Sequence, residues 1–212
     1  MNKPLVTILL LGSFDPQTKL ILENVKEEIV KTFSGENVFA LMLDTLEIYT
    51  ADDMEILTEL SGEKTITLFI FQNSQLIDIN DIKLKASSVD KTVYDYLKEK
   101  YTIKKVDKLP IFNKLDILMR DATVIFLLKH KEETRGGEYL ELMHALFRGQ
   151  ADKIWFLKKN GIVLSAMLME YLDKYQVKMR TYDEENDLND ALIRILTYQL
   201  QNLQSPLRNL KV

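Results

Sequence analysis

The chain has 212 residues, of which 46% are hydrophobic, and a formal net charge of −4 from 28 basic and 32 acidic side chains. This length suits one large domain or one domain with an insertion, and the hydrophobic share is typical of a globular protein with a full core. A nearly balanced, slightly acidic composition argues against a broad nucleic-acid or membrane-binding surface. Because there is no cysteine, disulfides, thiolate nucleophiles and cysteine zinc sites are excluded. With only two histidines, we expect no dedicated transition-metal site. We also expect no cofactor.

The first apolar run covers residues 5–11 and ends at Gly12. It is short for a signal peptide and lacks a small-residue cleavage site, so it predicts a buried strand instead. No apolar run reaches the length that a bilayer-spanning helix needs. We therefore expect a cytoplasmic protein without a membrane partner.

The first elements follow a strand–helix–strand order. After the strand at residues 5–11, apolar positions on helical spacing predict a helix over residues 18–33, and Gly35 is a natural C-terminal cap. Residues 38–43 are the second predicted strand. This order indicates the start of a parallel sheet.

The middle of the chain, residues 45–108, is less regular and is predicted to be an inserted α/β elaboration. Within it we expect a short helix at 51–60, a strand at 65–71 that residues 75–79 pair back onto, and an amphipathic helix at 88–101.

Regular alternation returns from residue 112. The pattern predicts helices at 112–121, 136–147, 162–175 and 187–202, and strands at 123–128, 153–157 and 177–182. Strands that alternate with helices of about ten to fifteen residues indicate a doubly wound α/β fold. We therefore expect a single Rossmann-like, flavodoxin-like domain over residues 1–204, with a mainly parallel five-stranded sheet, helices on both faces and a loose tail at 205–212.

Ligands of such folds bind at the rim that the carboxyl ends of the strands form. Four segments reach this rim: residues 12–15, 44–45, 130–137 and 182–184. The third is the richest, because Gly136 and Gly137 let the backbone approach a ligand and the new helix directs free N–H groups to the rim. Arg135 and His130 lie in the same segment, and an arginine there can bind a phosphate or a carboxylate.

Glu138 and Glu141 are three residues apart on this helix, so they share a face, and His144 is three residues further on. One carboxylate can act as a nucleophile while its neighbour positions the substrate or moves a proton. A structural alternative exists for Glu138, since an acidic residue in the first turn stabilises the helix dipole by about 0.3–1 kcal/mol. Glu141 stands among apolar neighbours and is expected to be partly buried, which for a carboxylate requires a reason.

Three short motifs resemble the nucleoside 2-deoxyribosyltransferases and the related TIR-like NAD-cleaving domains. The first motif is the strand end Leu10-Leu11-Gly12-Ser13-Phe14, and the second is Asp116 followed by Asp121-Ala122-Thr123-Val124-Ile125. The third is Gly137 followed four residues later by Glu141, in a helix that continues to Ala145. The chain departs from the family where Glu138 replaces the usual Thr, and where residues 134–136 replace an Asp before the glycine.

The resemblance implies an enzyme that cleaves or transfers the N-glycosidic bond of a nucleoside or nucleotide, with Glu141 as the nucleophile. Glu138 or Asp15 would hold the sugar hydroxyls or assist proton transfer, and Tyr139 or Phe14 would stack on the base. The other expected ligand-binding residues are Gly12, Ser13, His130, Arg135, Gly136 and Gly137. The resembling enzymes share residues across subunits, which implies a homodimer or a higher homo-oligomer. Two alternatives remain, a nucleotide-binding or sensing domain without chemistry and a TIR-type interaction domain.

Overall fold

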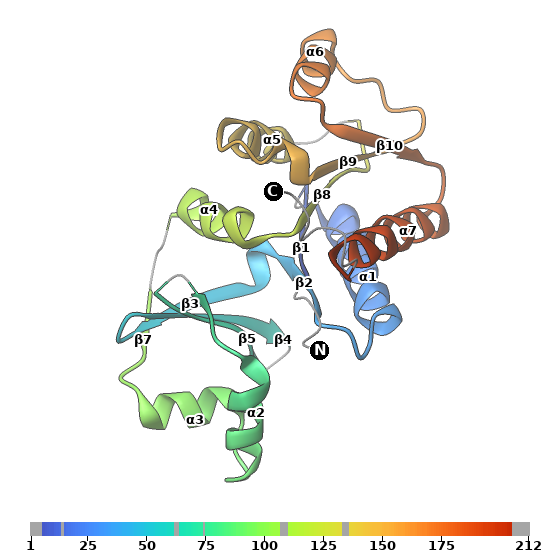
Figure 1. Ribbon diagram of the computed structural model, residues 1–212. Coiled ribbons are helices and arrows are strands. Elements are labelled where there is room, and N and C mark those ends of the chain that lie inside the picture. Colours follow the sequence, from blue (N-terminus) through green and yellow to red (C-terminus); the bar gives the residue numbers. More distant parts are fainter. Residues whose placement is uncertain are drawn as a thin grey trace, which may run out of the picture. The chain divides into compact units, whose positions relative to one another are not determined.

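The computed structural model describes residues 6–13, 15–61, 64–73, 75–106, 110–132 and 136–204. Its ribbon is drawn in Figure 1. The chain divides into two compact units, one formed by Met1–Ala40 with Asp116–Val212 and the other by Leu41–Leu115. Each unit has its own sheet. The predicted tail at 205–212 lies outside the described residues.

The first unit is built on the predicted five-stranded parallel sheet, with the strand order β10-β9-β8-β1-β2. Every residue of β1 and β8 is buried, which explains why both strands are continuous apolar runs in the sequence. β1 and β8 pair in register from Ile8 opposite Val124 to Gly12 opposite Leu128. The five strands are β1 Val6–Gly12, β2 Val38–Met42, β8 Val124–Lys129, β9 Ile154–Lys159 and β10 Lys178–Tyr182.

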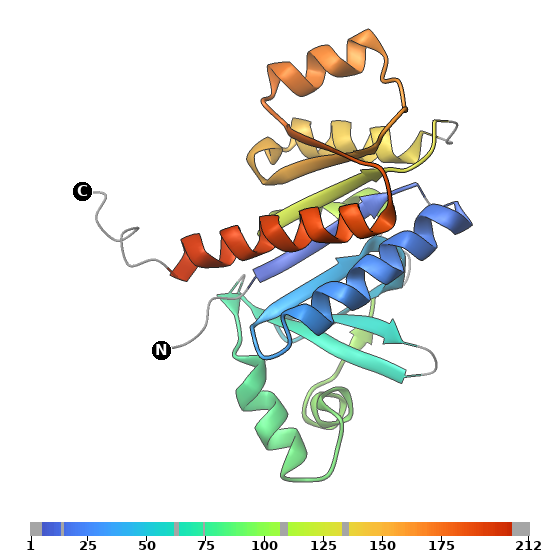
Figure 2. The same ribbon diagram turned by 90° about the vertical axis from the view of Figure 1, so that its right-hand side faces the viewer.

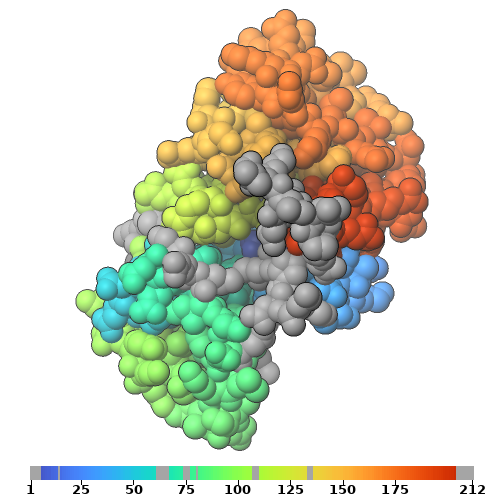
Figure 3. All heavy atoms as spheres, viewed as in Figure 1, coloured from blue at the N-terminus to red at the C-terminus, as the bar shows by residue number. Residues whose placement is uncertain are grey.

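Helices lie on both faces of this sheet. In Figure 2, α1 and α7 are together on one face, whereas α5 and α6 are on the other. α5 packs against β1 and β8. Figure 3 shows α6 and α7, in orange to red, at the surface of this unit. The helices of this unit are α1 Pro16–Thr32, α5 Gly137–Phe147, α6 Ala166–Lys174 and α7 Glu185–Gln204. α4 Ile111–Asp121 begins in the second unit and ends in the first.

The start of α1 shows how local chemistry sets an element boundary. Asp15 is the N-cap residue and accepts hydrogen bonds from the backbone N–H groups of Gln17 and Thr18, each at 3.2 Å. Pro16 occupies the first helical position, where its missing N–H costs nothing. The helix therefore starts two residues before the predicted residue 18.

The second unit contains an antiparallel sheet with the strand order β6-β5-β4-β3-β7. α2 and α3 pack against β5, and Leu97 of α3 belongs to a core cluster with Tyr49, Met54, Ile56 and Ile70. A 3₁₀ turn at Leu43–Thr45 precedes β3 in this unit, and another at Ala151–Lys153 precedes β9 in the first unit. The elements of this unit are β3 Leu46–Ala51, β4 Met54–Ser61, β5 Lys64–Gln72, β6 Gln75–Leu76, β7 Lys104–Lys105, α2 Ile79–Ser87 and α3 Val93–Lys100.

The helix predicted at residues 51–60 is wrong, because this segment is the turn and second strand of a β-hairpin. Asp52 and Asp53 have φ values of 36° and 66°. Two successive residues with positive φ form the turn that favours two-residue hairpins, and Asp tolerates this conformation better than most residues. β3 and β4 consequently pair antiparallel from Ala51 opposite Met54. The strand predicted at 65–71 is confirmed, and Gln75–Leu76 does pair back onto it.

The helix predicted at 88–101 is shorter in the structure and covers Val93–Lys100. Thr92 is its N-cap residue, and its hydroxyl accepts a hydrogen bond from the N–H of Asp95. In the part of the chain that the structure describes, no helix is both long enough and apolar enough to cross a membrane.

Candidate functional site

The strand order of the first unit reverses between β1 and β8. From β1 the chain adds β2 on one side, and it later adds β8, β9 and β10 on the other. Open α/β sheets bind ligands outside the carboxyl ends of the strands at such a point. Here those ends are Gly12 with Ser13, and Lys129 with His130, and α5 begins shortly after β8.

Two glycines at this rim have a structural reason. A Cβ on Gly12 would lie 3.0 Å from the carbonyl oxygen of Leu128, so a larger residue would push the ends of β1 and β8 apart. Gly136 is the N-cap residue of α5 and has a φ of 80°, in the left-handed region that glycine adopts without strain. Ser13 is buried beside Gly12. The predicted ligand-binding residues Phe14 and Arg135 lie outside the described residues.

Glu141 is buried on α5, with only 5% of its surface exposed. Burial raises the pKa of its carboxyl group from 4.5 to about 8, and the negative charge of Glu138 adds to this effect. A hydrogen bond from the backbone of Gly12 opposes the shift, because it favours the charged form. The second carboxyl oxygen, Oε2, has no hydrogen-bond partner among the described residues. Glu141 is therefore largely protonated at neutral pH, as expected of a carboxyl group in a functional site rather than on a surface.

Glu138 is fully buried and forms an ion pair with Lys129, in which Nζ of Lys129 lies 2.6 Å from Oε1 of Glu138. The Lys129 side chain is 1% exposed. Its ammonium group also donates to the carbonyl oxygen of Glu132 at 3.3 Å and lies 4.6 Å from the ring centre of Tyr139. Glu138 is thus an internal carboxylate and not merely a surface residue of the first helical turn.

Asp15 and Lys131 form a second ion pair, between the start of α1 and the loop after β8, with a distance of 2.9 Å. Asp15 also accepts a hydrogen bond of 2.5 Å from the hydroxyl of Thr18. Burial alone would raise the pKa of Asp15, but the hydrogen bonds from Thr18 and Lys131 hold it well below its ordinary range. Asp15 is therefore a charged acceptor that is already engaged by a helix N-terminus and a lysine.

His130 and Tyr182 connect the ends of β8 and β10. Nδ1 of His130 lies 2.9 Å from the hydroxyl of Tyr182, and the two rings are stacked with centroids 6.3 Å apart. Burial lowers the pKa of His130, and the charge of Lys159 lowers it further, so the imidazole is largely neutral at pH 7. Burial raises the pKa of Tyr182. His130 is therefore a buried, hydrogen-bonded residue of this rim.

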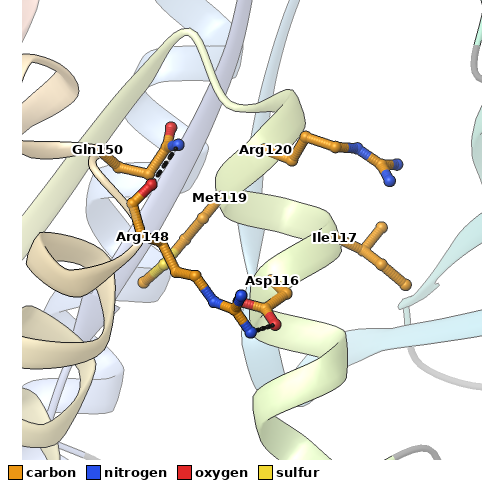
Figure 4. A pocket seen from close by; sticks show the side chains of 6 residues that line it. All are labelled: Asp116, Ile117, Met119, Arg120, Arg148 and Gln150. Carbon is orange, nitrogen blue, oxygen red and sulfur yellow. Dashed lines mark hydrogen bonds and ion pairs between the residues drawn. The ribbon is translucent and has the colours of Figure 1, made fainter.

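His144 contacts Asp116 of α4 and does not share a hydrogen bond with Glu141. Its Nε2 lies 2.7 Å from Oδ1 of Asp116, and Arg148 binds the other oxygen of the same carboxylate at 2.6 Å. Figure 4 shows the Arg148 side chain bound to Asp116, and both residues line a cavity of about 250 Å³. The cavity is lined by Asp116, Ile117, Met119, Arg120, Arg148 and Gln150. It lies beside the end of α5, so it is separate from Glu141 near the start of that helix.

The structure thus brings Glu141 to the backbone of Gly12, and Glu138 and Tyr139 to Lys129. The sequence analysis did not predict a role for Lys129. A lysine that ends a continuous apolar strand does, however, indicate a buried cation that needs a partner. Among the described residues, no group of three His, Asp or Glu side chains is placed to hold a metal ion. The chain matches no protein-family model and no curated protein. Its function is therefore inferred from the site itself.

Proposed function

We propose that this protein cleaves or transfers the N-glycosidic bond of a nucleoside or nucleotide, with Glu141 as the nucleophile. The observation that carries the proposal is a buried carboxyl group with a raised pKa beside the carboxyl ends of β1 and β8. The strand order and the helices on both faces support a doubly wound, flavodoxin-like sheet. Such sheets bind nucleotides where the strand order reverses, and Glu141 lies there.

In the proposed reaction, the ionised carboxylate of Glu141 attacks the anomeric carbon of the sugar. The bond to the base breaks, the base leaves with the bonding electron pair, and a glycosyl ester forms on Glu141. Water, or the nitrogen of a second base, then attacks the same carbon and releases Glu141. The first step requires Glu141 to be unprotonated when it attacks, so its raised pKa sets the pH range of the reaction.

The remaining roles are assigned to other residues of the rim. The Lys131 side chain is 38% exposed in its pair with Asp15, so it can reach a phosphate group of a ligand. We propose Arg135 as a second phosphate-binding residue and Phe14 or Tyr139 as the residue that stacks on the base. Glu138 can contact a sugar hydroxyl only if Lys129 releases it. The resembling enzymes share residues across subunits, so a homodimer or higher homo-oligomer is part of the proposal, together with a cytoplasmic location.

A nucleotide-binding domain without chemistry is the second candidate. The observation in its favour is that Glu141 is 5% exposed and Glu138 is held by Lys129, so neither carboxylate faces open solvent. In that case the same rim would bind the ligand, and substitution of Glu141 would leave the interaction in place.

Glu141→Gln is expected to abolish the release of free base. Purified wild type and variant are incubated with nucleosides, nucleoside monophosphates and NAD, and free base is followed by chromatography. The matched control is Glu170→Gln on α6, an exposed residue whose substitution should leave turnover unchanged. If the wild type releases no base from any of these compounds but one of them raises its melting temperature, the protein is a nucleotide-binding domain and not an enzyme of this kind.

The rate of base release is expected to rise with pH through about 8, because only the ionised form of Glu141 is nucleophilic and its pKa is raised to about 8. The measurement is kcat/KM between pH 6 and 9.5, which reports the ionisation of the free enzyme. A rate that instead falls through this range would show that the protonated carboxyl group is the active form, and Glu141 would then be a general acid.

A further inference from the structure

Lys129 is the one lysine in the described first unit whose side chain is 1% exposed and whose ammonium group binds a fully buried carboxylate. Removing both charges from water is expensive, and a buried ion pair often adds no stability over apolar residues of the same size. The proposed reaction gives Lys129 no direct contact with the substrate. Its position therefore calls for a role other than simple stabilisation of the fold.

Several contacts fix the ammonium group of Lys129. Lys129 is the last residue of β8, and its Nζ reaches Glu138 in the first turn of α5. The carbonyl oxygen of Glu132 and the ring of Tyr139 provide two more contacts. A cation held in this way keeps the carboxylate of Glu138 at a defined place near the start of α5.

Glu138 and Glu141 are three residues apart on α5, and the negative charge of Glu138 disfavours the ionised form of Glu141. Like charges in a buried site cannot both ionise freely. The ion pair with Lys129 assigns the charge to Glu138. Among the described residues, the hydrogen bond from Gly12 favours the ionised form of Glu141, but burial and the charge of Glu138 outweigh it, so Glu141 keeps its proton.

We propose that Lys129 is a positioning residue of this site, which fixes a negative charge on Glu138 and thereby controls the ionisation of Glu141. The effect on Glu141 is independent of any reaction, whereas its consequence for turnover rests on the proposed function. If Lys129 moves away from Glu138, the Glu138 carboxylate can accept the proton of Glu141, and the carboxylate then left on Glu141 can act as the nucleophile.

The other charged groups around α5 have partners of their own. In α4, Asp116 binds His144 and Arg148 of α5. At the rim, Asp15 binds Lys131. Burial and Glu138 are the two causes that raise the pKa of Glu141. Lys129 and Glu138 are therefore the pair to alter.

The test is a titration of Glu141 by carboxyl carbon NMR in protein labelled on glutamate side chains, with Glu141→Gln used to assign the signal. Three proteins are compared: wild type, Glu138→Gln and the double variant Lys129→Met with Glu138→Gln. Both substitutions nearly preserve side-chain shape, and the double variant removes the whole ion pair, so the fold is retained even if the single variant is destabilised. Asp116→Asn is the matched control, since it removes a carboxylate that contacts α5 through His144.

The expected order of the Glu141 titration midpoints is wild type highest, the double variant intermediate and Glu138→Gln lowest. In Glu138→Gln the like charge is gone and the Lys129 cation is free to favour ionised Glu141, so the midpoint falls by about 1–3 pH units. In the double variant only burial and the Gly12 hydrogen bond remain. Asp116→Asn should leave the midpoint unchanged. Equal midpoints in all proteins, or equal midpoints in the single and double variants, would overturn the role of Lys129.

Failure of this inference can be separated from failure of the proposed function. If the midpoints follow the expected order but no base is released from any substrate, the role of Lys129 is supported and the proposed enzymatic activity is refuted. If base release depends on Glu141 but the Glu141 titration midpoint is the same in all three proteins, the proposed activity is supported and Lys129 has only a structural role. For an active enzyme, the pH dependence of kcat/KM should shift to lower pH in Glu138→Gln by the same amount as the NMR midpoint.

Discussion

Lys129→Met is expected to lower the free energy of unfolding by about 3–5 kcal/mol, because it leaves the fully buried carboxylate of Glu138 without its cation. The apolar Met side chain fits the stem of the lysine but offers no hydrogen bond to replace the contact of 2.6 Å. Glu138 must then either stay charged in a buried site without its cation or bind a proton, and both cost free energy at neutral pH. Urea denaturation at pH 7 measures the loss.

The double variant Lys129→Met with Glu138→Gln should recover most of this loss, because neither residue then leaves a charge without a partner. Lys131→Met is the matched control, since it removes a lysine two residues away whose ion pair with Asp15 is partly exposed. Exposed pairs contribute at most about 1 kcal/mol. A loss in Lys129→Met no larger than the loss in Lys131→Met would contradict the importance of the buried pair.

The parallel sheet of the first unit can be predicted from the sequence because its central strands are buried on both faces. Strands such as β1 and β8 appear as continuous apolar runs, and the helices between them have apolar residues on helical spacing. The antiparallel sheet of the second unit is harder to predict. Its β3–β4 turn consists of Asp52 and Asp53, a pair that lacks the glycine by which such turns are usually recognised. Without a glycine to indicate the turn, the sequence pattern of residues 51–60 favours a helix over a strand.

The candidate site can be predicted in outline, since the carboxyl ends of the strands indicate where the rim lies. This rule points to Gly12, Asp15, Glu138 and Glu141, and each lies at the end of β1 or near the start of α1 or α5. The partners of these residues cannot be predicted in the same way, because they depend on side-chain directions and burial. Sequence spacing suggests that Glu138 faces a ligand, whereas the structure directs it to Lys129.

Wild-type protein is expected to lose stability relative to Glu141→Gln as the pH rises from about 4.5 to about 8. The pKa of Glu141 is raised from 4.5 to about 8 by burial and by the charge of Glu138. Over this interval the folded protein keeps a proton on Glu141 that the unfolded chain has released. Its contribution to stability is therefore fully present below the ordinary pKa and is lost as the pH approaches the raised one.

The ionisation of Glu141 changes the free energy of unfolding by at most about 1.4 kcal/mol per pH unit. The amide of the Glu141→Gln variant does not titrate, so position 141 adds nothing to the pH dependence of its unfolding free energy. The difference in unfolding free energy between the two proteins therefore grows to roughly a few kcal/mol by about pH 8. Urea denaturation at pH 5, 6.5 and 8 measures it, and Glu170→Gln, an exposed substitution, should run parallel to the wild type. A constant difference between wild type and Glu141→Gln would mean that Glu141 ionises at its ordinary pH. A growing difference would mean that the fold accepts a destabilising carboxyl group at this rim, which selection for stability alone would replace with glutamine.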